Sequence, residues 1–200
     1  MACGKSLGRL AGLLGLSLFA MTTVPALAQT AATGGGNYVL NAAHSKMQFS
    51  ISHFIVSSTE GRFSNFDGRL TFQPQAPERG VVTVHVAPGS VDTGIAARDE
   101  HLRTADFFDV ARFPLATFQS MSLATTDGRT GTLTGMLTLH GVTKPITLNA
   151  TLQSPALTGD QLVFSLKGTL KRSDFGMNSY MSVIGDIVTL DIEAEFDKSR

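Results

Sequence analysis

The chain has 200 residues, with 16 Lys and Arg against 16 Asp and Glu, and 42% of its residues are hydrophobic. This length fits one domain with a core large enough to need no cross-links. The balanced charge gives no electrostatic basis for binding nucleic acid or an anionic membrane surface.

Residues 1–28 have the anatomy of a secretory signal peptide. Lys5 and Arg9 precede an uncharged apolar run at 10–20, and the small-x-small sequence Ala-Leu-Ala at 26–28 offers a cleavage site. The apolar run is shorter than the roughly 20 residues of a membrane span. We therefore expect export and cleavage, and no stable membrane span.

The next segment, 29–37, contains three consecutive glycines and is expected to be a flexible leader. The remaining residues, 38–200, show no internal repeat and no second domain boundary. The single cysteine, Cys3, lies in the expected signal peptide, so the mature chain would use no disulfide.

From Tyr38 onward the hydrophobic residues recur with a period of two. In the segment 187–196, one face of an extended chain would carry Val188, Leu190, Ile192, Ala194 and Phe196. Similar patterns or strand-forming runs predict strands at 46–55, 68–72, 81–86, 115–123, 132–140, 146–152, 161–170 and 187–196. About eight strands at regular spacing are typical of an antiparallel barrel or sandwich.

One stretch, 92–109, does not alternate. Asp99 and Arg103 are four apart and would share a helix face, while Leu102, Ala105 and Phe108 would line an apolar side. We expect one or two short helices here, with Asp106 as a cap, that end before Pro114.

The sequence "ARDEHLRTADFFDVARFP" at 97–114 is dense in charge and therefore a candidate site. His101 directly follows Glu100, and no second histidine lies four residues on, so the zinc motif His-Glu-x-x-His is absent and no metal is expected. Acidic residues have basic neighbours, which favours ion pairing over proton transfer. We expect a structural brace over one end of the barrel. Its members would be Arg98, Asp99, His101, Arg103 and Asp106.

Motifs for catalysis are weak. "SDFG" at 173–176 contains the metal-binding tripeptide of kinases but lacks the other kinase motifs, and no Ser or Cys stands in a nucleophile motif. We therefore expect no enzyme and assign no catalytic residue. The alternatives are a lipid hydrolase or isomerase that uses His101 with Asp99 or Glu100, and a packed stress-protective interaction protein.

Six segments together resemble the YceI-like family of periplasmic lipid- or polyisoprenoid-binding proteins. They are "YVLNAAHSKMQFSISHF", "GRFSNFDGRLTF", "RDEHLRTADFFDVARFP", "LTGMLTLHGVTKPITL", "LKRSDFGM" and "IGDIVTLDIEAEF", in the family's order. The resemblance implies a lipocalin-like antiparallel β-barrel for 38–200, a long apolar pocket and a periplasmic location. It also implies non-catalytic binding, storage or transport of a quinone-type or polyprenyl isoprenoid or a similar lipid, with no cofactor beyond that ligand.

The alternation of the strands suggests which side chains would face such a ligand. An eight-stranded barrel can hold one small ligand, and a strand shifted by one residue would present its other face. An exposed edge or apolar rim could support a homodimer. The expected ligand-binding residues are Phe49, Ile51, Phe72, Val84, Phe118, Leu137, Leu148, Phe164 and Leu190.

Overall fold

The computed structural model describes residues 35–53, 57–156 and 158–199. These residues belong to one compact unit. The expected signal peptide and most of the expected leader lie outside the described residues. So do Phe54 and Ile55, the last two residues of the strand predicted at 46–55.

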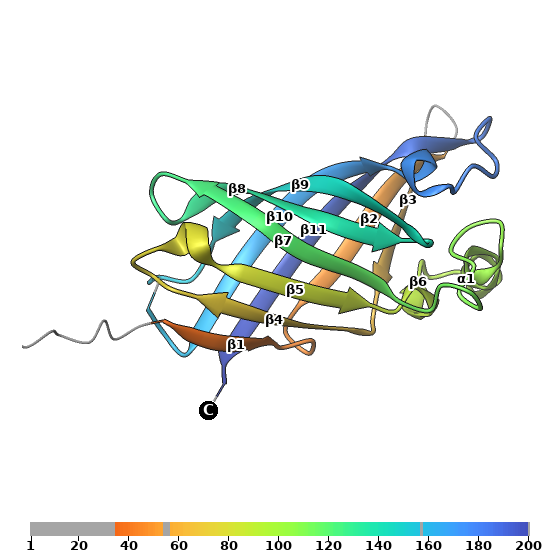
Figure 1. Cartoon of the computed structure of the whole chain (residues 1–200). Coiled ribbons are helices and arrows are strands. Elements are labelled where there is room, and N and C mark those ends of the chain that lie inside the picture. Colours follow the sequence, from red (N-terminus) through yellow and green to blue (C-terminus); the bar gives the residue numbers. More distant parts are fainter. Residues whose placement is uncertain (1–34, 54–56, 157, 200) are drawn as a thin grey trace, which may run out of the picture. The chain divides into compact units, whose positions relative to one another are not determined.

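The described residues form an antiparallel β structure with short helical connections (Figure 1). The helical elements are one α-helix and three 3-10 turns: α1 (Ala96–Arg103), η1 (Pro77–Arg79), η2 (Pro88–Ser90) and η3 (Arg172–Phe175). The strands are β1 (Gly36–Leu40), β2 (Lys46–His53), β3 (Ser57–Phe63), β4 (Phe66–Phe72), β5 (Val81–Val86), β6 (Val91–Asp92), β7 (Ala116–Thr125), β8 (Thr130–Leu139), β9 (Val142–Leu152), β10 (Gln161–Lys171) and β11 (Ile184–Lys198).

Eight of the strands close into a ring in the order β1-β4-β5-β7-β8-β9-β10-β11, with β11 pairing back to β1. Every pairing in the ring is antiparallel. Closure satisfies the backbone hydrogen bonds that an open sheet would leave at its edges. The expected antiparallel barrel is confirmed, and the sandwich is not formed.

The long strand β11 is shared between two partners on one edge. Its last residues, Phe196 to Lys198, pair with β1, whereas Ile184 to Glu193 pair with β2. Strands β3 and β6 then continue outward from β2. The barrel wall is therefore extended at one end by β2, β3 and β6, and α1 follows β6 at that end (Figure 1).

Each of the eight predicted strands is present, but the sequence pattern missed three. β1 and β6 are only 5 and 2 residues long, and β3 (SSTEGRF) is mostly polar. A half-polar or very short strand carries little alternation for the pattern to detect. β1 also begins at Gly36, so the last two residues of the expected leader, Gly36 and Asn37, belong to the sheet.

The region 92–109 contains a single α-helix, α1. Because α1 ends at Arg103, Ala105 and Phe108 lie beyond it and do not extend a helical apolar face. Asp99 and Arg103 both lie in α1 but do not pair with each other, since Arg103 Nη1 binds Glu100 Oε1 at 2.8 Å and the Asp99 carboxylate accepts from Thr93. Asp106 accepts from His101, and its carboxylate caps no described helix.

Strand β7 carries an irregularity between Ser120 and Ser122 that changes which residues face inward. Phe118 before it and Leu123 after it both face the interior, whereas Met121 is 66% exposed. A bulge of this kind inserts one residue and reverses the alternation beyond it.

The interior contains two clusters of buried side chains. One closes the barrel end near the C-terminus and includes Tyr38 and Leu162, which are fully buried. The Tyr38 hydroxyl donates to the Gly159 carbonyl at 3.0 Å. The other cluster includes Phe118, Leu148 and Phe175. Members of both clusters line a cavity in the barrel.

Within the described ranges, no helix has the length and apolar character needed to cross a membrane.

Candidate functional site: an apolar barrel cavity

The barrel encloses a cavity of about 560 Å³. Its wall includes all nine residues that alternation selected as ligand-facing: Phe49, Ile51, Phe72, Val84, Phe118, Leu137, Leu148, Phe164 and Leu190. Binding by these residues stays a prediction, but their position on the wall is observed. An interior that was packed solid, as the stress-protective alternative required, is not what the structure has.

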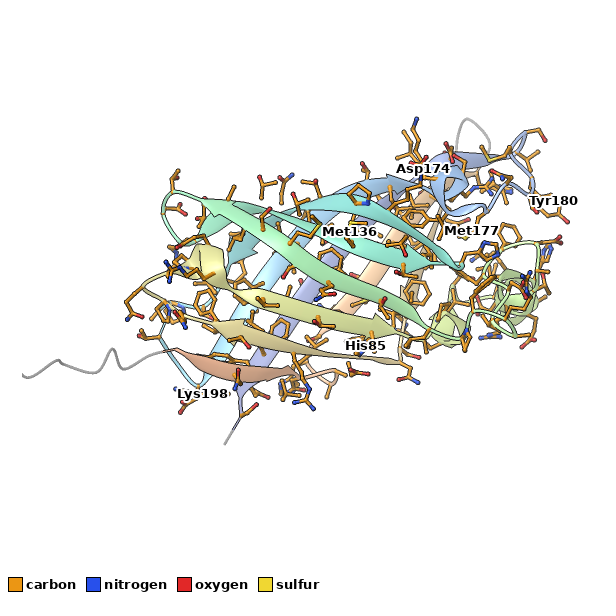
Figure 2. All side chains as sticks on the ribbon, viewed as in Figure 1. His85, Met136, Asp174, Met177, Tyr180 and Lys198 are labelled. Carbon is orange, nitrogen blue, oxygen red and sulfur yellow. The ribbon has the colours of Figure 1, made fainter. Side chains whose placement is uncertain are left out.

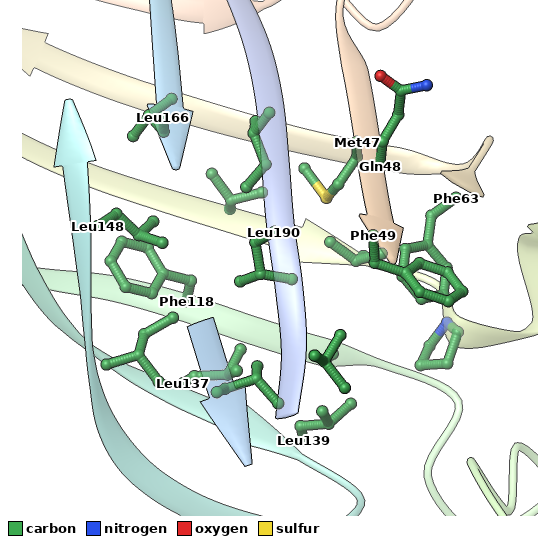
Figure 3. A pocket seen from close by; sticks show the side chains of 18 of the residues that line it. Met47, Gln48, Phe49, Phe63, Phe118, Leu137, Leu139, Leu148, Leu166 and Leu190 are labelled. Atoms are coloured by element: carbon green, nitrogen blue, oxygen red, sulfur yellow. The ribbon is translucent and has the colours of Figure 1, made fainter. Parts of the chain in front are cut away.

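Figure 3 shows apolar side chains from several strands gathered around one space, with Phe118, Leu137 and Leu148 beside one another. Strands β7, β8 and β9 supply them, and register places Phe118 opposite Leu137. In contrast, the Gln48 amide is turned away from this apolar group (Figure 3). Most of the surface offered to a ligand is therefore hydrocarbon.

The polar residues of the wall come from elements outside the closed ring. The eight strands of the closed ring contribute only apolar side chains, while polar ones come from β2, β3, α1, η3 and the segment after η3. We call this polar group the mouth. Its residues are Gln48, His53, Thr59, Arg98, His101, Arg172 and Tyr180.

Helix α1 is fixed to the barrel through Thr93. The buried carboxylate of Asp99 accepts from the Thr93 backbone N–H at 2.9 Å and from its hydroxyl at 2.6 Å. Arg98 donates through Nε to the Thr93 hydroxyl oxygen and through Nη2 to the Thr93 carbonyl. Arg103 donates to the carbonyls of Gly89 and Val91. These three side chains therefore bind mainly backbone and hydroxyl groups, and Arg103 also pairs with Glu100. That they act as a brace stays a prediction.

His101 links α1 to the segment after η3. Its Nε2 lies 2.9 Å from Asp106 Oδ2. Its ring packs edge-on against Phe107 and Tyr180, at 5.2 and 5.5 Å between centroids, and these two rings stack on each other. The catalytic pairing of His101 with Asp99 or Glu100, considered from sequence, is therefore not formed.

Arg172 organises the connection between β10 and β11. It is 3% exposed and donates to four carbonyls, those of Met177, Ser179, Ile184 and Gly185, at 2.8 to 3.0 Å. Burial lowers the pKa of its guanidinium, and nearby Asp186 acts in the opposite direction. The Arg172 side chain thus holds the segment that carries Met177 and Tyr180. Figure 2 labels both residues, which line the cavity wall.

The motif "SDFG" has a structural role in this connection. Ser173 donates from its backbone and its hydroxyl to Asp186, and the backbone hydrogen bond lowers the pKa of that carboxyl. Phe175 is buried, and Gly176 ends η3 at a φ of +79°. A glycine adopts this left-handed conformation without the steric cost that other residues incur.

Several wall residues were missed by sequence reasoning because they lie outside regular alternation. Thr59 and Phe63 lie on the undetected strand β3, and Met177, Tyr180 and Val183 lie in the connection after η3. "LKRSDFGM" marked that connection as characteristic, but its place beside the cavity depends on long-range pairing. Across residues 35–53, 57–156 and 158–199, no group of His, Cys, Asp and Glu has an arrangement that could hold a metal ion.

Comparison with known proteins finds a match to the model of the YceI-like domain over residues 38–196. "Protein YceI" of Salmonella newport (strain SL254) is 39% identical over 155 residues, which cover 76% of this chain and 81% of the Salmonella protein. "Protein YceI" of Salmonella arizonae matches to the same extent.

Solved structures show the same fold. A Campylobacter jejuni YceI protein superposes with a TM-score of 0.68 at 32% identity and covers 74% of this chain and 90% of that one. BcnA of Burkholderia cenocepacia gives 0.72 at 25% identity, with 78% and 98% covered. A polyisoprenoid binding domain from Saccharophagus degradans gives 0.65 at 20% identity, with 81% and 98% covered, which is a likeness of fold.

Proposed function

Because this chain belongs to the YceI-like domain family and its barrel encloses an apolar cavity, we propose that it binds a long-chain isoprenoid or similar lipid without catalysing a reaction. A quinone-type or polyprenyl chain fits the proposal. The observation that supports it most directly is the cavity of about 560 Å³, because the eight strands of the closed ring line this cavity with apolar side chains only. Ligand pockets are commonly apolar spaces with a few polar groups that fix orientation.

The physical basis is the transfer of hydrocarbon out of water. Each buried CH₂ contributes about 0.8 kcal/mol, whereas non-covalent affinities saturate near about −18 to −21 kcal/mol. A long tail therefore offers ample driving force but little discrimination. Selectivity among lipids must therefore come from the length of the cavity and from the polar residues of the mouth.

Export to the periplasm completes the proposal. The signal-peptide pattern of residues 1–28 supports it, and a periplasmic carrier would shield an insoluble chain from water during storage or transport. The protein would then meet its ligand at or between membranes.

The test is identification of the native ligand. Protein purified from the periplasm of its own host is extracted with organic solvent, and the extract is analysed by mass spectrometry. We expect a reproducible lipid with a long apolar chain. A cavity that is repeatedly empty, and that also rejects added prenyl lipids, would overturn the proposal.

A catalytic role makes a different prediction for His101. If the protein were a lipid hydrolase or isomerase, the variant His101→Ala would fold and bind lipid but lose turnover. We expect instead that this variant mainly loses thermal stability, because His101 joins Asp106, Phe107 and Tyr180 at the mouth. Thermal melting and product analysis of the same preparation separate the two.

A further inference from the structure

The mouth carries basic side chains and no carboxylate. Arg98, His101 and Arg172 line the cavity, and no Asp or Glu among the described residues does so. A hydrocarbon tail can neither accept a hydrogen bond from the two guanidinium groups nor neutralise their charge. Burying part of such a group has a cost in solvation that a ligand of opposite charge would offset.

Arg98 has hydrogen-bonding capacity that the protein does not use. Its side chain is half-buried, and its Nε and Nη2 atoms bind Thr93. Within the described part of the chain, Nη1 makes no hydrogen bond and no carboxylate lies within ion-pair distance of Arg98. The Thr93 contacts fix the plane of the guanidinium and leave one edge available.

Arg172 adds a second positive charge to the same wall. Its hydrogen bonds all go to carbonyl oxygens, and Asp186 influences it only at longer range. Tyr180, in the segment that Arg172 holds, contacts His101 of α1. The elements that carry the two arginines therefore meet at the mouth.

The carboxylates near α1 already have partners. Asp99 accepts from Thr93, Glu100 pairs with Arg103, and Asp106 pairs with His101. None of these acids pairs with Arg98. The positive charge at the cavity wall is thus left for a ligand rather than for the protein's own acids.

We propose that the mouth selects lipids with an anionic head group, a phosphate ester or a carboxylate, and that Arg98 is the residue that contacts it. This inference rests on the proposed function, since the tail must first occupy the barrel. The tail would point toward the cluster around Tyr38 and Leu162, and the head would lie between α1 and the segment after η3. A planar guanidinium binds the oxygens of phosphate or carboxylate through paired hydrogen bonds.

The experiment compares four ligands that share one geranylgeranyl chain and differ in the head: a monophosphate, a carboxylate, an alcohol and an amine. Their dissociation constants are measured by displacement of a fluorescent apolar dye at pH 7 and low salt. We expect the monophosphate, the carboxylate or both to bind at least about tenfold more tightly than the alcohol, and the amine to bind most weakly. The two anionic ligands separate phosphate from carboxylate recognition.

Two variants assign the preference to Arg98. Arg98→Met keeps an apolar stem and removes the charge, so it should lower the ratio of anion affinity to alcohol affinity, measured on the same preparation, to near unity. Arg69→Met is the matched control, because Arg69 is an exposed residue of β4 outside the cavity wall. The control should keep the wild-type preference. A preference that survives in Arg98→Met overturns the assignment.

The wild-type protein gives a test that needs no folded variant. If the preference is electrostatic, raising the salt concentration from about 0.01 M to about 0.5 M should reduce it, because the Debye length falls well below 10 Å. A preference that does not change with salt contradicts the inference. Equal binding of the anion and the alcohol overturns it but leaves the proposed function standing, whereas rejection of all four ligands overturns both.

Discussion

Arg172 shows how one residue can position a functional region without alternation to reveal it. A buried guanidinium satisfies four carbonyls that belong to the connection between β10 and β11. Backbone acceptors that are buried without a partner have a high cost, so the connection and the arginine depend on each other. Lysine could not replace it, because three donors on one atom cannot span four carbonyls in this fork geometry.

The variant Arg172→Met tests this dependence. It removes the donors and keeps most of the side-chain volume, and we expect the free energy of unfolding to fall by about 3 kcal/mol. For a domain of this size, that corresponds to a fall in Tm of roughly 10 °C. Arg69→Met, the exposed control on β4, should change the free energy of unfolding by less than about 0.5 kcal/mol. A loss below about 1 kcal/mol in Arg172→Met would contradict this role.

At the scale of elements, the turn between β7 and β8 is held by Asp127. Its carboxylate accepts from the backbone N–H groups of Arg129 and Thr130 and from the Thr130 hydroxyl. These hydrogen bonds lower the pKa of Asp127 from 3.8 to about 2. An Asp-Gly pair is typical of a turn, and here the Asp127 carboxylate stabilises it.

The lowered pKa of Asp127 makes the stability of the folded protein depend on pH. Because the pKa in the folded protein is below that of the unfolded chain, the contribution of Asp127 to stability is complete above about pH 4 and is lost as pH falls toward 2. The variant Asp127→Asn should melt at a lower temperature than wild type at pH 7, and the difference should shrink as pH falls through this window. Melting curves from pH 7 to pH 2 measure it.

Asp174→Asn is the control for that comparison. Asp174 is exposed, and its carboxylate makes no hydrogen bond within the described ranges. Its melting curve should follow that of wild type throughout. If the difference between Asp127→Asn and wild type stayed constant down to pH 2, the explanation by hydrogen bonds to the ionised carboxylate would be wrong.

The two-residue loop between β8 and β9 is a second place where the local sequence suits the connection that forms. His140 and Gly141 both have positive φ, +52° and +75°. Two positive φ values in a two-residue loop match the right-handed twist of the flanking strands. His140 and Gly141 therefore form a hairpin loop between Leu139 and Val142, whereas the packing of the His140 ring against Phe113, at 4.9 Å between centroids, depends on the fold.

For the whole molecule, the cavity is the property on which the proposed function depends. A larger side chain inside the cavity should weaken lipid binding while changing the stability of the ligand-free protein only slightly. Leu190→Trp places a larger side chain from β11 into the cavity and should weaken prenyl-lipid binding at least about tenfold. Because unfilled space accepts the added atoms, Tm of the ligand-free protein should fall by no more than a few degrees.

Thr189→Trp provides the control on the neighbouring position of the same strand. Thr189 is exposed and lies on the opposite face, so its lipid affinity should equal that of wild type. Wild type at a free ligand concentration of 100 times Kd should gain about 2.7 kcal/mol of stability, and Leu190→Trp should gain less at that concentration. Unchanged binding by Leu190→Trp would show that the ligand lies elsewhere.

Much of the fold followed from alternation, and the limits of that prediction are physical. The pattern placed Val188 to Phe196 correctly because each strand of the ring is apolar inside and polar outside. It did not predict β3, whose sequence is mostly polar, or the bulge in β7 that exposes Met121. In the charged stretch at 97–114, the sequence could not give the partners of Asp99 and Arg103, because hydrogen bonds to Thr93 and to backbone carbonyls leave no sequence pattern.

The sequence by itself determined the class of structure, the inward face of most strands and nine of the side chains that line the cavity. These depend on the period of two, which is a local property of an extended chain. Only the tertiary structure decided that the cavity stays open, that its polar residues come from elements outside the closed ring, and that Arg98 and Arg172 reach its wall from elements far apart in the chain. Those properties arise from ring closure and from the shared edge of β11, which join segments that no local pattern connects.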